Sequence, residues 1–181
     1  MAATLELLRE TDHSRIQMRD VADAAGVALG TVYRYFRSKE HLLAEVLSAW
    51  AQGLRADIDR RPLQGDSNVE RLTDALHRSV RAFESWPAMA RVLIALEGST
   101  DPFTQEVFAR NNRQNAGVYV EVLRDLPPDV AGDVVRVASA VLDLQLRQWA
   151  IGNRPIADVY ERLARSVWLL LRFHESGPDP G

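Results

Sequence analysis

Apolar residues recur at three- and four-residue intervals along most of this 181-residue chain, a spacing that is typical of amphipathic helices. The segment after Ser38 shows the pattern clearly, with apolar side chains at Leu42, Leu43, Val46, Leu47, Trp50 and Leu54. No segment alternates apolar and polar residues over the length of a strand. The pattern therefore predicts an all-α fold.

Glycine, proline and polar clusters divide the chain into about nine predicted helices, four before residue 61 and five after it. They are expected at 2–12, 19–25, 29–36, 39–61, 68–83, 87–97, 103–126, 129–151 and 156–174. Ser38 and Asn68 are the expected N-caps of the fourth and fifth helices. The predicted domains are a small head at 1–47, a larger helical domain at 48–175 and a flexible tail at 176–181.

Composition narrows the class of protein. Hydrophobic residues make up 46% of the chain, and the lack of cysteine excludes disulfides, thiolate metal sites and a cysteine nucleophile. The most apolar stretches, 134–151 and 159–173, are interrupted by charged residues, and the first residues do not resemble a signal peptide. We therefore expect a cytoplasmic protein that binds no membrane and needs no cofactor.

The segment 18–40 carries the most informative pattern. Small apolar side chains lie on one face of the predicted helix at 19–25, Gly26 allows a tight turn, and Val27 is expected to fill the gap before the next helix. Val32 and Phe36, four residues apart, are expected to face inward from that next helix. Such a helix-turn-helix can insert its second helix into the major groove of DNA, which is about 12 Å wide.

The second helix is then expected to point a mixed set of side chains outward. These are Leu29, Gly30, Thr31, Tyr33, Arg34 and Tyr35. Their hydroxyl and guanidinium groups suit phosphates and base edges. The net charge of the chain is −3, yet residues 15–39 hold five basic and two acidic side chains. The competing interpretation is that the tyrosines are packing residues and the arginines are ordinary surface residues.

The dense run Gly-Val-x-x-Gly-Thr-Val-Tyr-Arg-Tyr-Phe-x-Ser-Lys-Glu-x-Leu-Leu, at 26–43, closely resembles the TetR family of one-component regulators. The sequence of this run is similar to that of the branch that includes actinobacterial steroid-catabolism repressors. The resemblance is strong over 16–47 and implies a three-helix DNA-binding head followed by a ligand-binding and dimerisation domain. It implies a repressor rather than an enzyme: a homodimer that binds a palindromic operator and is released by a small hydrophobic effector.

The resemblance also assigns DNA contacts to positions of this chain. They are Gln17, Met18, Arg19, Leu29, Gly30, Thr31, Tyr33, Arg34, Tyr35 and Lys39. Two features depart from the family. Ala28 stands where serine or threonine usually caps the recognition helix, and the helix beginning at Ala2 corresponds to the second half of the family's first helix. We therefore expect a shortened first helix.

Aromatic and aliphatic residues of the larger predicted domain are candidates for lining an effector pocket. They are Trp50, Leu54, Leu76, Val80, Phe83, Trp86, Met89, Leu93, Leu96, Phe103, Val107, Tyr119, Leu142, Gln145 and Trp149. An apolar cavity with a few polar anchors is the usual form of such a site, although the same stripes also fill ordinary helical cores. The resemblance favours a sterol-derived or other acyl-CoA ester, with bulky hydrophobic drugs as the alternative.

The last two predicted helices have apolar faces wider than one packing partner requires, which predicts a four-helix dimer interface. The candidate residues are Val130, Val134, Val137, Val141, Leu144, Val159, Leu163, Val167, Leu170 and Leu171. The alternative is that these residues are buried within one subunit.

Two other functions fit parts of the sequence. Glu10-x-x-His13 and Asp74-x-x-His77 have the carboxylate-x-x-His spacing of helical metal enzymes, although His13 falls in a predicted loop. A helical adaptor that has lost DNA binding is the other alternative. Arg34 and Lys39 argue against it because they place positive charge where phosphates would lie.

Overall fold

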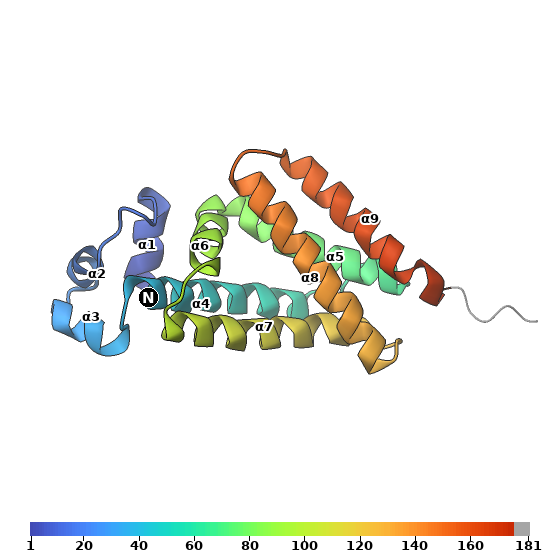
Figure 1. Ribbon diagram of the computed structural model, residues 1–181, viewed down its shortest axis with the longest axis horizontal. Helices are drawn as coiled ribbons and strands as arrows, with labels where there is room; N and C mark the ends of the chain where they lie inside the picture. The colour runs from blue at the N-terminus through green and yellow to red at the C-terminus, as the bar shows by residue number, and fades with distance from the viewer. Residues whose placement is uncertain (176–181) are drawn as a thin grey trace, which may run out of the picture. The chain divides into compact units, whose positions relative to one another are not determined.

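The computed structural model describes residues 1–175, except for the side chains of residues 57–59, 115–116 and 173–175. Within this part the chain forms nine helices and no strand (Figure 1), which confirms the predicted all-α class. The helices are α1 (Ala2–Glu10), α2 (Met18–Ala25), α3 (Leu29–Tyr35), α4 (Lys39–Arg60), α5 (Asn68–Ser85), α6 (Pro87–Glu97), α7 (Pro102–Val122), α8 (Pro128–Ala150) and α9 (Ile156–Glu175). The tail predicted at 176–181 lies outside the described residues. Among the described helices, none combines the length and the apolar character that crossing a membrane requires.

Side-chain caps explain where α4 and α5 begin. The Oγ atom of Ser38 accepts the His41 N–H at 2.9 Å, so Ser38 caps α4 as predicted. At α5 the prediction that Asn68 is the N-cap is wrong. The Oγ atom of Ser67 accepts the Glu70 N–H at 3.2 Å, and the Glu70 carboxylate accepts the Ser67 N–H at 3.1 Å. Ser67 is the N-cap because it forms a reciprocal capping box with Glu70.

Contacts between residues divide the chain into two compact units. The first unit comprises Met1–Gly53 and Trp86–Asn112, and the second comprises Leu54–Ser85 and the chain from Arg113 onward. This grouping differs from the predicted division after residue 47. The difference arises because α6 and the first half of α7 belong to the same unit as α1, α2 and α3.

In the first unit, α2 packs against both α1 and α3. Gly26 ends α2 with φ +66°, and the Val27 N–H bonds to the Ala22 carbonyl at 3.0 Å in a left-handed C-cap. Val32 is buried as predicted, and Phe36 is half-buried. The predicted gap-filling role of Val27 is wrong, because its side chain is 42% exposed while its backbone closes the cap.

Polar contacts join α6 and α7 to the head within this first unit. The Arg91 Nε atom lies 3.5 Å from Asp12 Oδ2, which follows α1. The Ser38 hydroxyl donates to Asp101 Oδ2 at 3.2 Å, so the residue that caps α4 also bonds to the turn before α7. These contacts explain why the structure groups α6 and the start of α7 with the helix-turn-helix.

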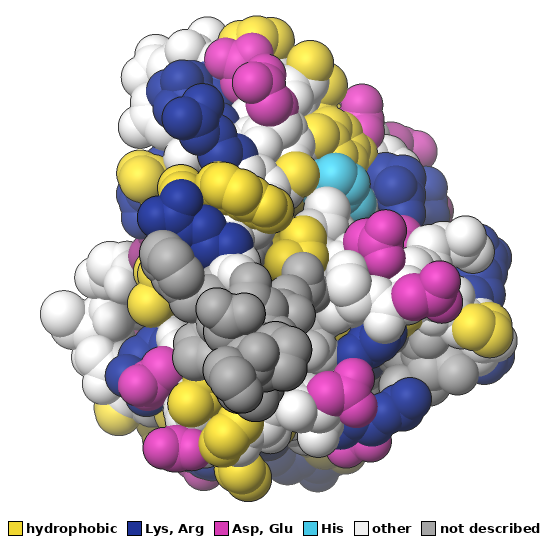
Figure 2. Space-filling model, turned by 90° about the vertical axis from the view of Figure 1, so that its right-hand side faces the viewer, with side chains coloured by type: hydrophobic (Ala, Val, Ile, Leu, Met, Phe, Trp, Pro, Cys, Tyr) yellow, Lys and Arg dark blue, Asp and Glu magenta, His cyan; other side chains and the backbone are white. Residues whose placement is uncertain are grey.

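In the second unit, α9 packs against α5 and α8. Val159, Leu163, Val167 and Leu171 follow one another at four-residue intervals on α9, and all four are buried. They form the inward ridge that an amphipathic helix places against its neighbours. The space-filling view in Figure 2 shows apolar side chains lying among basic and acidic ones on the face that it presents.

Candidate functional site

Two short helices, α2 and α3, carry most of the side chains expected to contact DNA. α2 begins with a capping box in which Asp20 Oδ2 accepts the Gln17 N–H at 2.8 Å. α3 begins after Ala28, which supplies no side-chain cap, as its departure from the family pattern implied. The turn at Gly26 separates the two helices, so this segment is the predicted helix-turn-helix.

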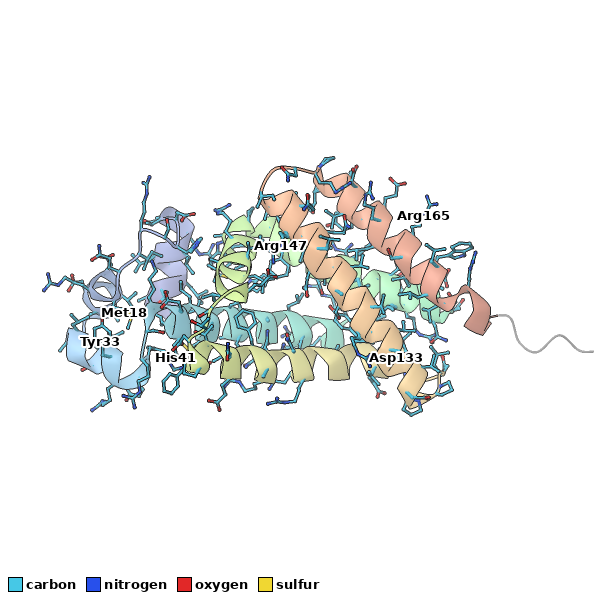
Figure 3. The ribbon with its side chains drawn as sticks, in the orientation of Figure 1. Met18, Tyr33, His41, Asp133, Arg147 and Arg165 are labelled. Atoms are coloured by element: carbon cyan, nitrogen blue, oxygen red, sulfur yellow. The ribbon has the colours of Figure 1, made fainter. Side chains whose placement is uncertain are left out.

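The outward face of α3 is open to solvent. Tyr33 is 47% exposed and Tyr35 is 64% exposed, and Arg34 between them is exposed as well. Val32 is buried on the opposite face (Tyr33 is labelled in Figure 3). The competing interpretation, in which the tyrosines are packing residues of the head, therefore does not describe them. Leu29 and Thr31 are half-buried at the edge of this face.

Arg34 and Tyr35 contact one another on this face. The Arg34 Nη2 atom donates to the Tyr35 hydroxyl at 3.4 Å, and the guanidinium carbon lies 5.1 Å from the centre of the Tyr35 ring. Such a cation–π contact contributes about 0.5–1 kcal/mol at an exposed site. It holds a cation and a hydroxyl side by side, both of which are groups that bind phosphate oxygens.

Gly30 leaves space beside these side chains. Apart from its chain neighbours and the backbone of its own helix, a Cβ atom added at Gly30 would meet no described atom within 4 Å. The position is exposed, so nothing in the described chain occupies the space above it. A large ligand can therefore approach the α3 backbone closely at this point.

At the start of α2, Met18 lies apart from its neighbours Gln17 and Arg19. The Met18 side chain is 7% exposed, whereas Gln17 and Arg19 are exposed (Met18 is labelled in Figure 3). Met18 shares a helix face with buried Val21, three residues later, and this places it in the core of the head. The structure thereby corrects the DNA contact expected from the Met18 side chain.

Lys39 opens α4 as expected, but its ammonium group has a protein partner. Lys39 Nζ donates to the Ser14 carbonyl at 3.0 Å, which ties the start of α4 to the segment between α1 and α2. That segment is itself held by Asp12, whose Oδ1 accepts the Ser14 N–H at 2.9 Å. These bonds place the Lys39 charge on the same unit as α3, beside the exposed Arg15.

The candidate effector residues divide between the two units. The first unit holds Trp50, Trp86, Met89, Leu93, Leu96, Phe103 and Val107, and the second holds Leu54, Leu76, Val80, Phe83, Tyr119, Leu142, Gln145 and Trp149. All but Phe103 are buried or half-buried. Phe103 is exposed at the surface of the first unit, where one face of its ring stacks on His41 with the ring centres 5.4 Å apart.

Buried polar groups lie among the apolar candidates of the second unit. The Tyr119 hydroxyl and Ser79 Oγ are 2.8 Å apart, and burial raises the pKa of Tyr119. The buried Oε1 atom of Gln145 has no hydrogen-bond partner within the described part of the chain. Ser79 was missed because a serine within an apolar stripe usually bonds back to its own helix, as it also does to Ala75 here.

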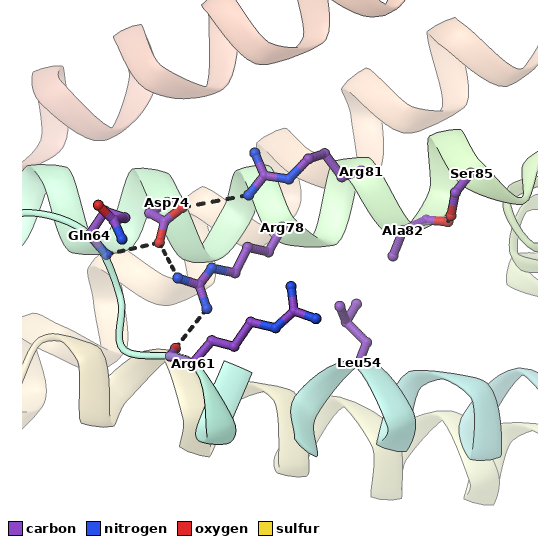
Figure 4. Close-up of a pocket in the computed structure, with 8 residues that line it drawn as sticks. All are labelled: Leu54, Arg61, Gln64, Asp74, Arg78, Arg81, Ala82 and Ser85. Carbon is purple, nitrogen blue, oxygen red and sulfur yellow. Dashed lines mark hydrogen bonds and ion pairs between the residues drawn. The ribbon is translucent and has the colours of Figure 1, made fainter. Parts of the chain in front are cut away.

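A cavity of about 430 Å³ lies in the second unit between the end of α4 and one face of α5 (Figure 4). Its lining consists of Leu54, Arg61, Gln64, Asp74, Arg78, Arg81, Ala82 and Ser85. Only Leu54 was among the predicted pocket residues, because apolar stripes, on which that prediction rests, do not include the charged residues of this lining. The available signal was the spacing of Asp74, Arg78 and Arg81, which places two cations and a carboxylate on one face of a helix.

The predicted dimer residues separate into two faces. Val134, Val159, Leu163, Val167 and Leu171 are buried within the subunit, so the structure corrects their assignment to an interface. Val130, Val141 and Leu170 are half-buried, and Val137 and Leu144 are exposed. Ile151, Trp168 and Leu169 are also exposed but were not predicted. For Ile151 the available signal was its seven-residue interval from Leu144 and Val137, which continues one helix face.

Asp74 and His77, the second carboxylate-x-x-His pair, have other partners. Asp74 accepts hydrogen bonds from the Gln64 N–H at 2.9 Å and from Arg78 Nη2 at 2.7 Å. The His77 Nε2 atom lies 3.1 Å from the Tyr160 carbonyl, and burial lowers the pKa of His77. Within the described residues no group of three or more metal-binding side chains comes together.

Comparison with known proteins defines the class of protein that this fold and head represent. Residues 1–46 match the family model of the bacterial regulatory proteins of the tetR family. The HTH-type transcriptional repressor KstR of Mycolicibacterium smegmatis is 30% identical over 178 residues, which cover 96% of this chain and 85% of the relative. The chain belongs to the TetR family of transcriptional regulators, which confirms the resemblance drawn from residues 26–43, and this relative lies in the predicted branch.

Solved structures give the same fold. A TetR transcriptional regulator from Rhodococcus sp. RHA1 superposes with a TM-score of 0.77 at 24% identity, covering 94% of this chain and 92% of that one. The Thermus thermophilus FadR repressor, in complex with lauroyl-CoA, also gives a TM-score of 0.77, at 22% identity, with 99% and 96% coverage.

Proposed function

We propose that the chain is a homodimeric, effector-responsive repressor that binds a palindromic operator through α3. The observation that carries this proposal is the exposed face of α3, where Arg34 lies between Tyr33 and Tyr35 beside the open position at Gly30. Hydroxyl groups of this kind bind phosphates, and an arginine can also read a guanine edge. Because its target is chromosomal DNA, the protein acts in the cytoplasm.

Footprinting of the full-length protein on the promoter of its own gene tests the operator. We expect two protected half-sites whose centres lie about 34 Å apart, one turn of the duplex, because a two-fold dimer presents two copies of α3. Lys39→Ala is expected to weaken binding to all sequences, since a phosphate contact carries no base preference. Protection of a single site, or none, would overturn the proposal of a dimeric repressor.

The dimer is proposed to form through the exposed apolar residues of α8 and α9. Val137 and Leu144 lie one heptad apart on α8, and Trp168 and Leu169 are exposed on α9. Two copies of such a helix pair would bury these side chains in a four-helix interface. Sedimentation should show that Leu144→Glu is monomeric, whereas Arg124→Glu, outside both helices, remains dimeric. A dimeric Leu144→Glu variant would exclude this face.

The proposed effector is an acyl-CoA thioester, including a sterol-derived one. Support comes from the lauroyl-CoA bound to Thermus thermophilus FadR and from the buried polar groups of Tyr119 and Gln145. An effector that prefers a conformation with lower operator affinity must release DNA by linkage. Titration of palmitoyl-CoA into the protein–operator complex should release the duplex, while palmitate at the same concentration should not. Failure of both palmitoyl-CoA and lauroyl-CoA to release DNA would exclude simple acyl-CoA thioesters.

A further inference from the structure

The cavity between α4 and α5 has a cationic lining. The guanidinium groups of Arg61, Arg78 and Arg81 are accompanied by one carboxylate, that of Asp74. Asp74, Arg78 and Arg81 share a face of α5 because seven residues make about two helical turns. Figure 4 shows Arg61 extending along the cavity from the segment after α4, and Arg78 and Arg81 directed from α5 toward Asp74. The lining therefore carries more positive than negative charge.

Arg78 holds the wall of this cavity in place. Its guanidinium donates to the carbonyls of Arg61 and Pro62 and to Asp74 Oδ2, each at 2.7 Å. These bonds fasten the segment after α4 onto α5. Burial alone would raise the pKa of Asp74, but the Gln64 N–H and Arg78 hold that pKa below its ordinary value. Asp74 is therefore charged at neutral pH and is the one carboxylate of the lining.

Arg81 is placed differently from Arg78. Its side chain is 54% exposed, and its Nη2 atom lies 3.6 Å from Asp74 Oδ1, which is longer than a hydrogen bond. Arg81 can therefore turn toward an anion in the cavity without breaking a short contact. Arg61 is exposed as well and approaches from the opposite wall.

We propose that this cavity binds the phosphate groups of an organic phosphate, with Arg81 and Arg61 as its charged ligands. The forked guanidinium group matches phosphate oxygens in pairs. The inference rests on the proposed acyl-CoA effector, because the nucleotide end of coenzyme A carries a phosphomonoester and a pyrophosphate. A volume of about 430 Å³ is near the lower end of the roughly 300–1,000 Å³ of ligand pockets, so the cavity suits a headgroup and not a complete acyl-CoA.

Calorimetric titration of the full-length protein with three probes tests this site. The probes are coenzyme A, palmitoyl-CoA and S-palmitoyl-pantetheine, which has the same thioester without phosphate. We expect Arg81→Ala to weaken binding of both phosphate-bearing probes about tenfold, since it removes one charge-assisted contact. Arg81→Lys should weaken them less, because it keeps the charge and loses only the fork. S-palmitoyl-pantetheine should bind wild type and Arg81→Ala equally.

Arg124→Ala is the matched control, because Arg124 is an exposed arginine of the same unit outside the cavity lining. It should bind all three probes as wild type does. Unfolding curves identify any variant that fails to fold, and Arg61→Ala then tests the opposite wall with the same expected loss of phosphate-dependent affinity.

Three outcomes would overturn the inference. Equal affinity of palmitoyl-CoA for wild type, Arg81→Ala and Arg61→Ala would exclude the site while leaving an acyl-CoA effector in place, provided that palmitoyl-CoA still releases the operator. Absence of binding by coenzyme A and palmitoyl-CoA to a wild-type protein that binds its operator would exclude both the site and the effector class. Displacement of coenzyme A by an equal concentration of inorganic phosphate would indicate a site for free phosphate instead.

Discussion

Arg34 on α3 and Arg78 on α5 show two ways in which the same side chain is placed. Arg34 is exposed and contacts the neighbouring Tyr35 hydroxyl at 3.4 Å. Arg78 is 12% exposed and donates to three acceptors at 2.7 Å. The guanidinium of Arg34 is accessible to a large external anion, whereas that of Arg78 is saturated by the fold. Residue type alone therefore does not identify a binding arginine; its exposure and its partners do.

The largest expected effect is on DNA binding. Arg34→Ala should weaken operator binding by about 1–3 kcal/mol for each subunit, and thus by about twice that for a dimer. The unfolding free energy should fall by no more than about 1 kcal/mol, since the side chain is exposed and loses only its contact with Tyr35. Fluorescence anisotropy on a duplex operator and urea denaturation measure the two quantities. An Arg34→Ala protein that binds its operator as tightly as the Arg124→Ala control would remove Arg34 from the interface.

In contrast to Arg34→Ala, Arg78→Ala should act mainly on stability. It should lower the unfolding free energy by about 3 kcal/mol, because it leaves the shielded Asp74 carboxylate without its closest cation. Urea denaturation measures this loss, and Arg81→Ala, which removes only a longer contact, should cost much less. Equal stabilities of these two variants would contradict the structural role assigned to Arg78.

A smaller effect is expected from the acid titration of Asp74. The pKa of Asp74 is lowered in the folded protein, so its contribution to stability is complete above its ordinary value and is lost as the pH falls through the folded value. Asp74→Asn should therefore be less stable than wild type at pH 7 by about 1 kcal/mol, the net value of one hydrogen bond. Urea midpoints from pH 7 to pH 2 should converge. Plots of urea midpoint against pH that stay parallel for the two proteins would show that the Asp74 charge does not contribute to stability.

The smallest effect is expected at Gly30. Gly30→Ala should raise the unfolding free energy by about 0.5 kcal/mol, because alanine favours the helix and its Cβ meets no described atom beyond its chain neighbours and its own helix backbone. The same methyl group should weaken operator binding if DNA approaches the α3 backbone there. Thermal unfolding and anisotropy measure the two changes. Tighter operator binding by Gly30→Ala would contradict a close approach.

The head was predicted in detail because its residues have one inward and one outward side. The alternation of Val32 with Tyr33 and Arg34 identified both faces of α3. The burial of Met18 follows the same logic, because Met18 lies three residues before buried Val21 on one face of α2. The exposure of Val27 could not be derived in this way, because Val27 follows the C-cap Gly26, where the cap geometry directs the side chain.

The second unit was harder to predict because α8 and α9 have apolar residues on two faces. A periodic pattern showed that both faces are apolar, yet it did not separate Leu163, packed inside the subunit, from exposed Leu144. The arginine-lined cavity depends on contacts between the segment after α4 and α5, and no local spacing reports such a tertiary contact. The features that the sequence did not predict were thus set by packing between distant segments.

The salt dependence of DNA binding tests most directly whether the helix-turn-helix head, with Lys39 at the start of α4, binds phosphates. The full-length protein is titrated against a duplex from its own promoter at several salt concentrations, alongside Lys39→Ala. We predict that the logarithm of affinity falls linearly with the logarithm of salt concentration, with a slope of about −0.9 per phosphate contact, and that Lys39→Ala reduces this slope by about one. A folded protein whose affinity for every such duplex is negligible or insensitive to salt would contradict the claim.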